Sequence, residues 1–194
     1  MNAKRIIQIL AVGLCIGAGT LFFVPRNSFL PSFLSGRPTF KADGINQYVP
    51  ELHKAFIKKQ FNENWFLLVE PADFDVDFML DTHTPGKHYY QDYSGKLKII
   101  ALHADGKPVG FGTYYMLNSL TGRIQFIAVD KDARGKRYAD QLVNYAIADL
   151  KKLGAKVVRL ATRTTNTTAH KVYTRLGFEV VGSERDFNHY RKEI

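Results

Sequence analysis

The sequence predicts a mixed α/β fold of the α+β kind, with a mostly antiparallel central sheet flanked by helices and preceded by an N-terminal transmembrane helix. Three observations support this prediction. Segments 96–103 and 109–117 alternate in polarity around an Asp-Gly turn signal, as in a β-hairpin. Farther along, β-branched runs alternate with segments whose apolar residues recur every three or four positions, as in amphipathic helices. The uncharged apolar run 6–24 predicts the membrane segment.

Length and composition indicate one domain. The chain has 194 residues, of which 45% are hydrophobic, enough for one sizeable core. The only cysteine, Cys15, excludes an intramolecular disulfide and a cysteine-based metal cluster, and we expect no metal. The formal net charge of +9 permits contact with anions. However, the basic residues are spread along the chain and no nucleic-acid-binding signature is present, so we expect no nucleic-acid partner.

The N-terminal run 6–24 follows a short tail, 1–5, and is predicted to be a single transmembrane anchor. At about 1.5 Å per residue, a helix of this length nearly crosses the roughly 30 Å hydrocarbon core of a bilayer. The alternative is a cleavable signal peptide, because the small residues 17–19 resemble a cleavage site. Gly13 and Gly17 have the spacing that lets two membrane helices pack as a homodimer.

Residues 25–44 hold three of the seven prolines and are predicted to be a linker. The basic residues on the two sides of the apolar run 6–24 favour opposite membrane orientations. Lys4 and Arg5 favour a cytoplasmic N-terminus, which would place the domain outside, whereas the basic residues of the linker form a competing and more dispersed cluster. Charge alone therefore leaves the orientation open.

Residues 45–194 are expected to form the domain. Its first helix begins near Pro50, which is tolerated in a first turn, and the segment 65–69 is either a strand or the end of a buried helix. The inward-facing residues of this helix are predicted to be Leu52, Ala55, Phe56 and Phe61. The acidic segment 71–81 is either a negative rim for a cationic amine or a set of solvated carboxylates. The aromatic segment 88–93 either lines an acceptor pocket or packs as an ordinary loop.

A basic turn at 129–139 stands between a predicted strand, 123–129, and a predicted helix that ends at Gly154 as a left-handed cap. The apolar face of this helix consists of Ala139, Leu142, Val143, Ala146, Leu150 and Leu153. The first N–H groups of a helix have no internal partner and carry the positive end of its dipole. A basic turn that leads into a helix is therefore a phosphate-binding geometry.

Beyond that helix, the β-branched run 156–161 predicts a covered central strand. Residues 166–176 predict a short helix that has Thr165 or Asn166 as its N-cap and stops at Gly177. The runs 178–182 and 187–191 are predicted to complete the sheet.

The basic turn 129–139 and the segment of the short helix, taken together, resemble the GCN5-related N-acetyltransferase (GNAT) family. The acyl-CoA signature of the family, Arg/Gln-x-x-Gly-x-Gly/Ala, appears here as Arg134-Gly135-Lys136-Arg137-Tyr138-Ala139. A downstream pattern, Asn-x-x-Ala-x-x-x-Tyr-x-x-x-Gly-Phe, appears as Asn166, Ala169, Tyr173, Gly177 and Phe178. One departure stands out, because Arg137 replaces the central glycine and gives up its conformational freedom.

The resemblance implies that acetyl-CoA lies between two parallel strands that splay apart, 123–129 and 156–161. Tyr173 matches the usual general acid, which protonates the departing thiolate. The implied cofactor-binding residues are Ile127, Ala128, Val129, Arg134, Gly135, Lys136, Arg137, Tyr138, Ala139 and Asn166. No residue is a clear general base, so water is the expected proton acceptor. The remaining candidate bases are His103, His170, Glu184 and His189.

The resemblance implies an N-acetyltransferase that moves an acetyl group from acetyl-CoA to a primary amine of a small molecule or protein. The amine would attack directly in a ternary complex. The alternatives are a catalytically inactive GNAT-fold module that binds a ligand or partner, and a basic module on a membrane surface. Because acetyl-CoA is a cytosolic metabolite, the expected location is a single-pass membrane protein with a cytoplasmic catalytic domain. The alternative is that the protein is exported and its N-terminal segment is cleaved as a signal peptide.

Overall fold

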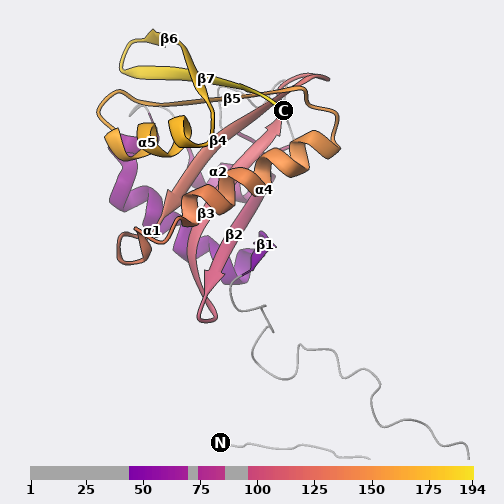
Figure 1. Ribbon diagram of the computed structural model, residues 1–194. Coiled ribbons are helices and arrows are strands. Elements are labelled where there is room, and N and C mark those ends of the chain that lie inside the picture. Colours follow the sequence, from indigo (N-terminus) through magenta and orange to yellow (C-terminus); the bar gives the residue numbers. More distant parts are fainter. Residues whose placement is uncertain (1–43, 70–73, 86–95) are drawn as a thin grey trace, which may run out of the picture. The chain divides into compact units, whose positions relative to one another are not determined.

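The structure is a computed structural model that describes residues 44–69, 74–85 and 96–194 (Figure 1). The predicted membrane segment 6–24 and aromatic segment 88–93 lie outside these residues, as do the tail 1–5 and nearly all of the linker 25–44. Within the described part of the chain, no helix is long and apolar enough to cross a membrane. The anchor therefore stays a prediction from the sequence.

One seven-stranded sheet forms the centre of the domain, in the order β1-β2-β3-β4-β5-β7-β6. All neighbouring strands are antiparallel except β4 and β5, which are parallel. The strands are β1 (Ile45–Gln47), β2 (Lys98–Ala104), β3 (Lys107–Met116), β4 (Thr121–Val129), β5 (Val157–Arg163), β6 (Glu179–Glu184) and β7 (Phe187–Glu193). The predicted hairpin and the mostly antiparallel sheet are confirmed. The short edge strand β1 was not predicted.

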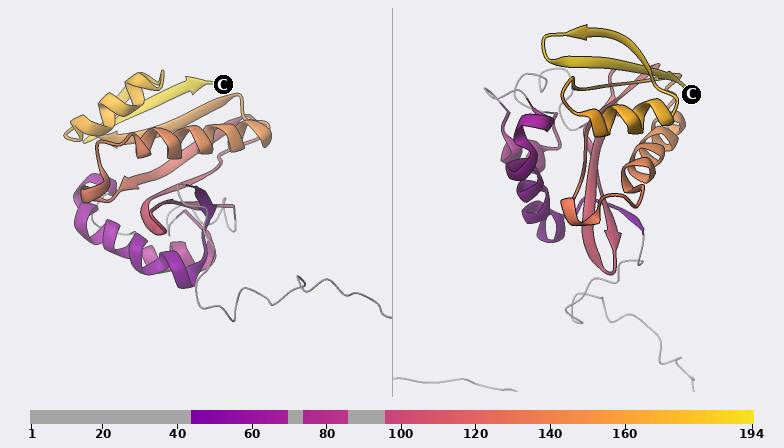
Figure 2. Two further views of the ribbon diagram at one scale, coloured as in Figure 1. Left: turned by 60° about the horizontal axis from the view of Figure 1, so that its bottom comes forward. Right: turned by 60° about the vertical axis from the view of Figure 1, so that its left-hand side comes forward.

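Helices cover both faces of this sheet, as the right-hand view of Figure 2 shows. The helices α1 (Pro50–Leu68) and α2 (Val76–Thr82) lie on one face, and α4 (Tyr138–Lys152) and α5 (Thr167–Arg175) on the other. Each face has its own apolar cluster, one containing Phe61 and Phe126 and the other Leu142 and Tyr173. A short 3-10 helix, η2 (Lys131–Ala133), lies between β4 and α4.

The packing of α4 on the sheet follows from its predicted apolar face. Leu142, Val143, Ala146 and Leu150 are buried, whereas Leu153 is 47% exposed because it lies beyond the last helical residue. Gly122 on β4 permits the close approach, since a Cβ atom there would lie 2.7 Å from the Leu150 side chain. Gly154 follows the helix with a left-handed φ of +100°, which confirms the predicted cap.

The buried face of α1 differs from the prediction. Ala55 is exposed, and the fully buried residues are His53, Ile57, Gln60 and Phe61. The segment after residue 64 continues as helix to Leu68, which settles the strand-or-helix alternative. The prediction is confirmed for Phe61 and wrong for Ala55. It missed His53 and Gln60 because apolar periodicity does not detect polar side chains that are buried with hydrogen-bond partners.

One of those polar residues, His53, is expected to make the stability of the fold sensitive to acid. His53 Nε2 lies 3.2 Å from His103 Nε2, and His53 Nδ1 accepts a hydrogen bond from the Val49 N–H at 2.8 Å. Burial, with a smaller contribution from His103, lowers the pKa of His53 to about 4, and burial also lowers the pKa of His103. The unfolded chain binds the proton more tightly, so the pair contributes stability above pH 6.5 that is lost as the pH falls toward 4.

We therefore expect protonation of His53 alone to lower the unfolding free energy by about 2–3 kcal/mol as the pH falls from 7 to 4.5. Urea denaturation at the two pH values measures this decrease. In His53→Gln the pH-dependent loss should shrink by that amount, whereas in His189→Gln, which changes a histidine outside the buried pair, it should persist. An equal pH dependence in the parent and His53→Gln would show that the pair does not control acid stability.

Candidate active site

The two parallel strands separate soon after they meet. β4 and β5 pair only at Thr121 with Val157, Gly122 with Val158 and Arg123 with Arg159. Past this point, β4 carries a bulge, because its register with β3 moves from Ile124 to Phe126 and leaves Gln125 as the extra residue. The predicted splaying of these two strands is confirmed.

A cleft of about 450 Å³ opens where the strands diverge. Its walls are the second half of β4, the turn before α4, helix α5 and the end of α1. Ten of the eleven predicted site residues line it: Ile127, Ala128, Val129, Arg134, Gly135, Arg137, Tyr138, Ala139, Asn166 and Tyr173. Lys136 is exposed and is not part of the lining. Predicted from two separate stretches of sequence, these residues are thus brought to one place.

The turn into α4 keeps its shape despite the missing glycine. Arg137 caps α4 with a left-handed φ of +57°, and Gly135 has a φ of +85°. The left-handed region costs a residue with a side chain about 1 kcal/mol, which glycine would avoid. Arg137 therefore adopts the left-handed backbone that glycine reaches freely, and its guanidinium adds a positive charge to the cleft lining.

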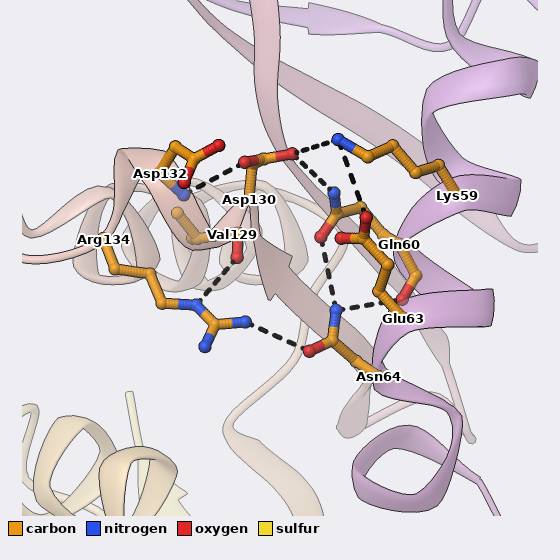
Figure 3. Close-up of polar contacts among 8 residues, drawn as sticks. All are labelled: Lys59, Gln60, Glu63, Asn64, Val129, Asp130, Asp132 and Arg134. Carbon is orange, nitrogen blue, oxygen red and sulfur yellow. Dashed lines mark hydrogen bonds and ion pairs between the residues drawn. The ribbon is translucent and has the colours of Figure 1, made fainter.

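Arg134 ties this turn to the neighbouring elements (Figure 3). Its Nε donates to the Val129 carbonyl at 3.2 Å, and its Nη2 donates to Asn64 Oδ1 at 3.0 Å. Asn64 breaks the helical backbone of α1, with φ −126° and ψ 19°, and its Nδ2 donates to the Gln60 carbonyl at 3.0 Å. The hydrogen bond between Arg134 and Asn64 holds the last turn of α1 beside the basic turn, where Leu67 borders the cleft.

Asp130 is the second link between the turn and α1 (Figure 3). Its Oδ2 accepts from Gln60 Nε2 at 2.9 Å and Lys59 Nζ at 3.1 Å, and its Oδ1 accepts from the Asp132 N–H at 3.1 Å. The bond from Asp132 N–H and the bond from Lys59 are the largest influences that lower the pKa of the Asp130 carboxyl. Asp130 therefore stays ionised while it caps η2 and pairs with the fully buried Gln60.

The mouth of the cleft is basic. Arg175 is engaged by Asp140, whose two carboxylate oxygens each lie 2.7 Å from Arg175 Nη2. Arg137 and Lys171 also line the cleft, and neither makes an ion pair within the described residues. Together with the N-terminus of α4, these cations favour a multiply charged anion such as a diphosphate.

Tyr173 lies on α5, 7% exposed, where its ring packs against those of Phe178 and Tyr190 at centroid distances of 5.9 and 5.6 Å. Burial raises the pKa of Tyr173, and Tyr190 raises it further. The phenol therefore stays protonated at neutral pH. Asn166 begins the same helix, and its Oδ1 accepts from the Ala169 N–H at 3.1 Å, which confirms one of the two predicted caps.

None of the four candidate bases lines the cleft. His103 is buried against His53, and His170 bonds both the Tyr190 hydroxyl and the Thr164 carbonyl. Glu184 lies on the exposed edge strand, and His189 lies on β7 opposite Ala161. Within the described residues, no cluster of three or more histidine, cysteine, aspartate or glutamate side chains is placed to hold a metal ion.

Sequence reasoning missed several residues of the lining. Asn64, Leu67 and Leu68 come from α1, whose sequence carries no phosphate-binding or acyl-binding pattern. Lys171 was also missed, although a basic residue within the second motif block was a usable signal.

Comparison with known proteins gives the same assignment. The acetyltransferase (GNAT) family profile matches residues 60–178. An uncharacterized N-acetyltransferase of Methanocaldococcus jannaschii is 38% identical over 81 residues, which are 39% of this chain. The chain spans only about a third of the length of that relative, 36%.

Two solved structures share the fold at low identity. YncA of Salmonella typhimurium, solved with acetyl-CoA, is 17% identical, with a TM-score of 0.60 over 79% of this chain and 94% of the other. The PaiA N-acetyltransferase of Thermoplasma acidophilum, solved with coenzyme A, is 14% identical, with a TM-score of 0.58 over 79% of this chain and 100% of the other. With its splayed parallel strands, basic turn and matching profile, the chain belongs to the GNAT family of acetyltransferases.

Proposed function

We propose that this protein transfers an acetyl group from acetyl-CoA to a primary amine of a small molecule or protein, by direct attack in a ternary complex. The cleft bordered by β4, the turn before α4, and α5 carries the proposal, because it joins a basic helix N-terminus to a buried, protonated tyrosine. The acetyl-CoA and coenzyme A bound in the two structural neighbours support the same donor.

The residues present fit such a donor. Where β4 leaves β5, the backbone groups of Ile127 and Val129 are in position to bond an extended arm in place of a strand. Leu67, Leu68 and Val172 supply apolar lining for that arm. The turn from Arg134 to Ala139 and the cations around it would hold the diphosphate.

Acetyl-CoA supplies an acyl group activated as a thioester. The amine nitrogen forms a bond to the carbonyl carbon, the carbon–sulfur bond breaks, and the sulfur leaves with the electron pair. Tyr173 donates a proton to the departing sulfur, while the proton lost by the amine passes to water and water reprotonates the phenol. The products are an amide and a free thiol.

The test is calorimetric titration of acetyl-CoA into the purified full-length chain. We expect a micromolar dissociation constant, about −8 kcal/mol, weakened about tenfold in Lys171→Ala because one charge-assisted contact to phosphate is lost. Lys151→Ala is the matched control, since Lys151 is an exposed cation in the last turn of α4, outside the cleft lining, and it should bind within about twofold of the parent.

The replacement of the family glycine by Arg137 and the absence of the four candidate bases from the cleft lining favour a second candidate, a GNAT-fold module that binds a ligand or partner without catalysis. Failure of the parent to bind acetyl-CoA, with binding restored in Arg137→Gly, would favour this candidate over the enzyme. Binding without amine acetylation by any acceptor would favour it as well.

We also propose that residues 6–24 anchor the protein in a membrane with its catalytic domain in the cytoplasm. The uncharged run and the cytosolic origin of acetyl-CoA support this location. Protease digestion of sealed, right-side-out membrane vesicles tests it. The domain should be protected, and its digestion there or its recovery as a soluble exported fragment would contradict the proposal.

A further inference from the structure

Three arginines stand in one row across the sheet, on the face opposite α4. Arg123 on β4 is the register partner of Arg159 on β5, which is the register partner of Arg191 on β7. Register partners point to the same side of a sheet, and neighbouring strands are about 4.8 Å apart. Gly122 and Val158, one position before Arg123 and Arg159, pack toward α4, so the arginines face the other way.

The charges in this row are unequally compensated. Arg191 Nη2 bonds Glu193 at 2.9 Å and has Glu179 as its register partner on β6. Arg123 Nε donates to the neutral Gln125 Oε1 at 3.1 Å, and among the described residues Arg123 has no ion-pair partner. Arg159, between the two, is exposed and makes no hydrogen bond or ion pair within the described part of the chain. Like charges directly opposite each other destabilise a sheet, and a bound anion would relieve that repulsion.

The row lies where the paired part of β4 and β5 ends. Arg123 and Arg159 are the last paired residues of β4 and β5, so the strands begin to separate immediately after them. Tyr173 lies at nearly the same level on the other face, because its ring contacts Tyr190, the register partner of Leu160. A molecule approaching the gap from the arginine side would thus face the proton donor across the sheet.

We propose that the acceptor amine carries an anionic group, a carboxylate or phosphate, that binds Arg159 and Arg123. This inference rests on the proposed acetyltransferase function. Neither Arg123 nor the bulge residue Gln125 is acidic, so these two positions offer no carboxylate to a cationic acceptor. Guanidinium groups pair bidentately with both oxyanions, so the row selects an acceptor that brings its own negative charge.

The test compares acetylation of 4-aminobutyrate and O-phosphoethanolamine with that of neutral 4-amino-1-butanol and cationic putrescine, using the full-length protein. We expect kcat/KM for at least one anionic amine to exceed that for the neutral one by tenfold or more. Arg159→Ala should abolish this preference by lowering only the anionic value, and Arg159→Lys should keep part of it. The two anionic amines distinguish a carboxylate from a phosphate site. Best turnover of putrescine or 4-amino-1-butanol, unchanged in Arg159→Ala, would overturn the proposal.

A second measurement covers the case in which no amine of this set is acetylated. Inorganic phosphate is titrated into the protein saturated with coenzyme A, which occupies the cleft itself. Phosphate binding that weakens at least fivefold in Arg159→Ala supports the anion site, and binding that is absent or unchanged overturns it. Acetyl-CoA affinity should be equal in the parent and Arg159→Ala. If neither binds acetyl-CoA, the proposed function fails instead.

Discussion

Replacing Tyr173 with phenylalanine is expected to lower kcat for acetyl transfer about 100- to 1,000-fold, because a positioned general acid contributes a factor of that size. The substitution removes only the hydroxyl, and the ring contacts with Phe178 and Tyr190 can persist. The phenol of Tyr173 is protonated at neutral pH, so it carries a proton that it can donate to the departing sulfur. A coupled thiol-release assay with a fixed amine measures the rate, and calorimetry measures acetyl-CoA affinity, which should change by less than about threefold.

Tyr145→Phe provides the matched control for this experiment. Tyr145 lies on α4 outside the cleft lining, and its hydroxyl accepts a long 3.5 Å contact from Gln47. Its kcat should remain within about twofold of the parent, as expected for a surface substitution. If Tyr173→Phe retained half of the parent kcat with an unchanged melting temperature, Tyr173 would be a packing residue and the acid would have to be sought elsewhere.

Replacing Asp130 with alanine is expected to lower the unfolding free energy by about 2–4 kcal/mol, because a buried amide loses its charged acceptor and η2 loses its cap. Gln60 is fully buried, so its Nε2 would remain unpaired away from water. The freed turn carries Arg134 and Arg137, so acetyl-CoA binding should also weaken about tenfold. Urea denaturation and calorimetric titration measure the two effects.

Lys59→Ala separates the buried contact from the surface ion pair. Lys59 is half exposed, so its pairing with Asp130 should contribute little to the unfolding free energy. If Lys59→Ala and Asp130→Ala lowered the unfolding free energy equally, the Gln60 contact would be unimportant. If Asp130→Ala left acetyl-CoA affinity unchanged, the network would stabilise the fold without positioning the turn.

The parts of this protein that the sequence determined by itself are those set by neighbours along the chain. The caps at Asn166 and Gly154 were predictable because a side-chain acceptor or a left-handed residue acts within one helical turn. The basic turn before α4 was predictable because helix ends attract anions wherever they occur. Ten of the eleven predicted site residues line the cleft because they belong to two such local blocks.

Only the tertiary structure decided which distant residues join those blocks. Asn64 meets Arg134 across 70 residues of sequence, and Gln60 meets Asp130 across the same separation. The arginine row depends on the register of three strands, which no single segment specifies. Polar side chains have no periodic signal that tells burial from exposure. Whether one is buried depends on the partner that the fold brings to it, and that partner is set by packing rather than by local sequence.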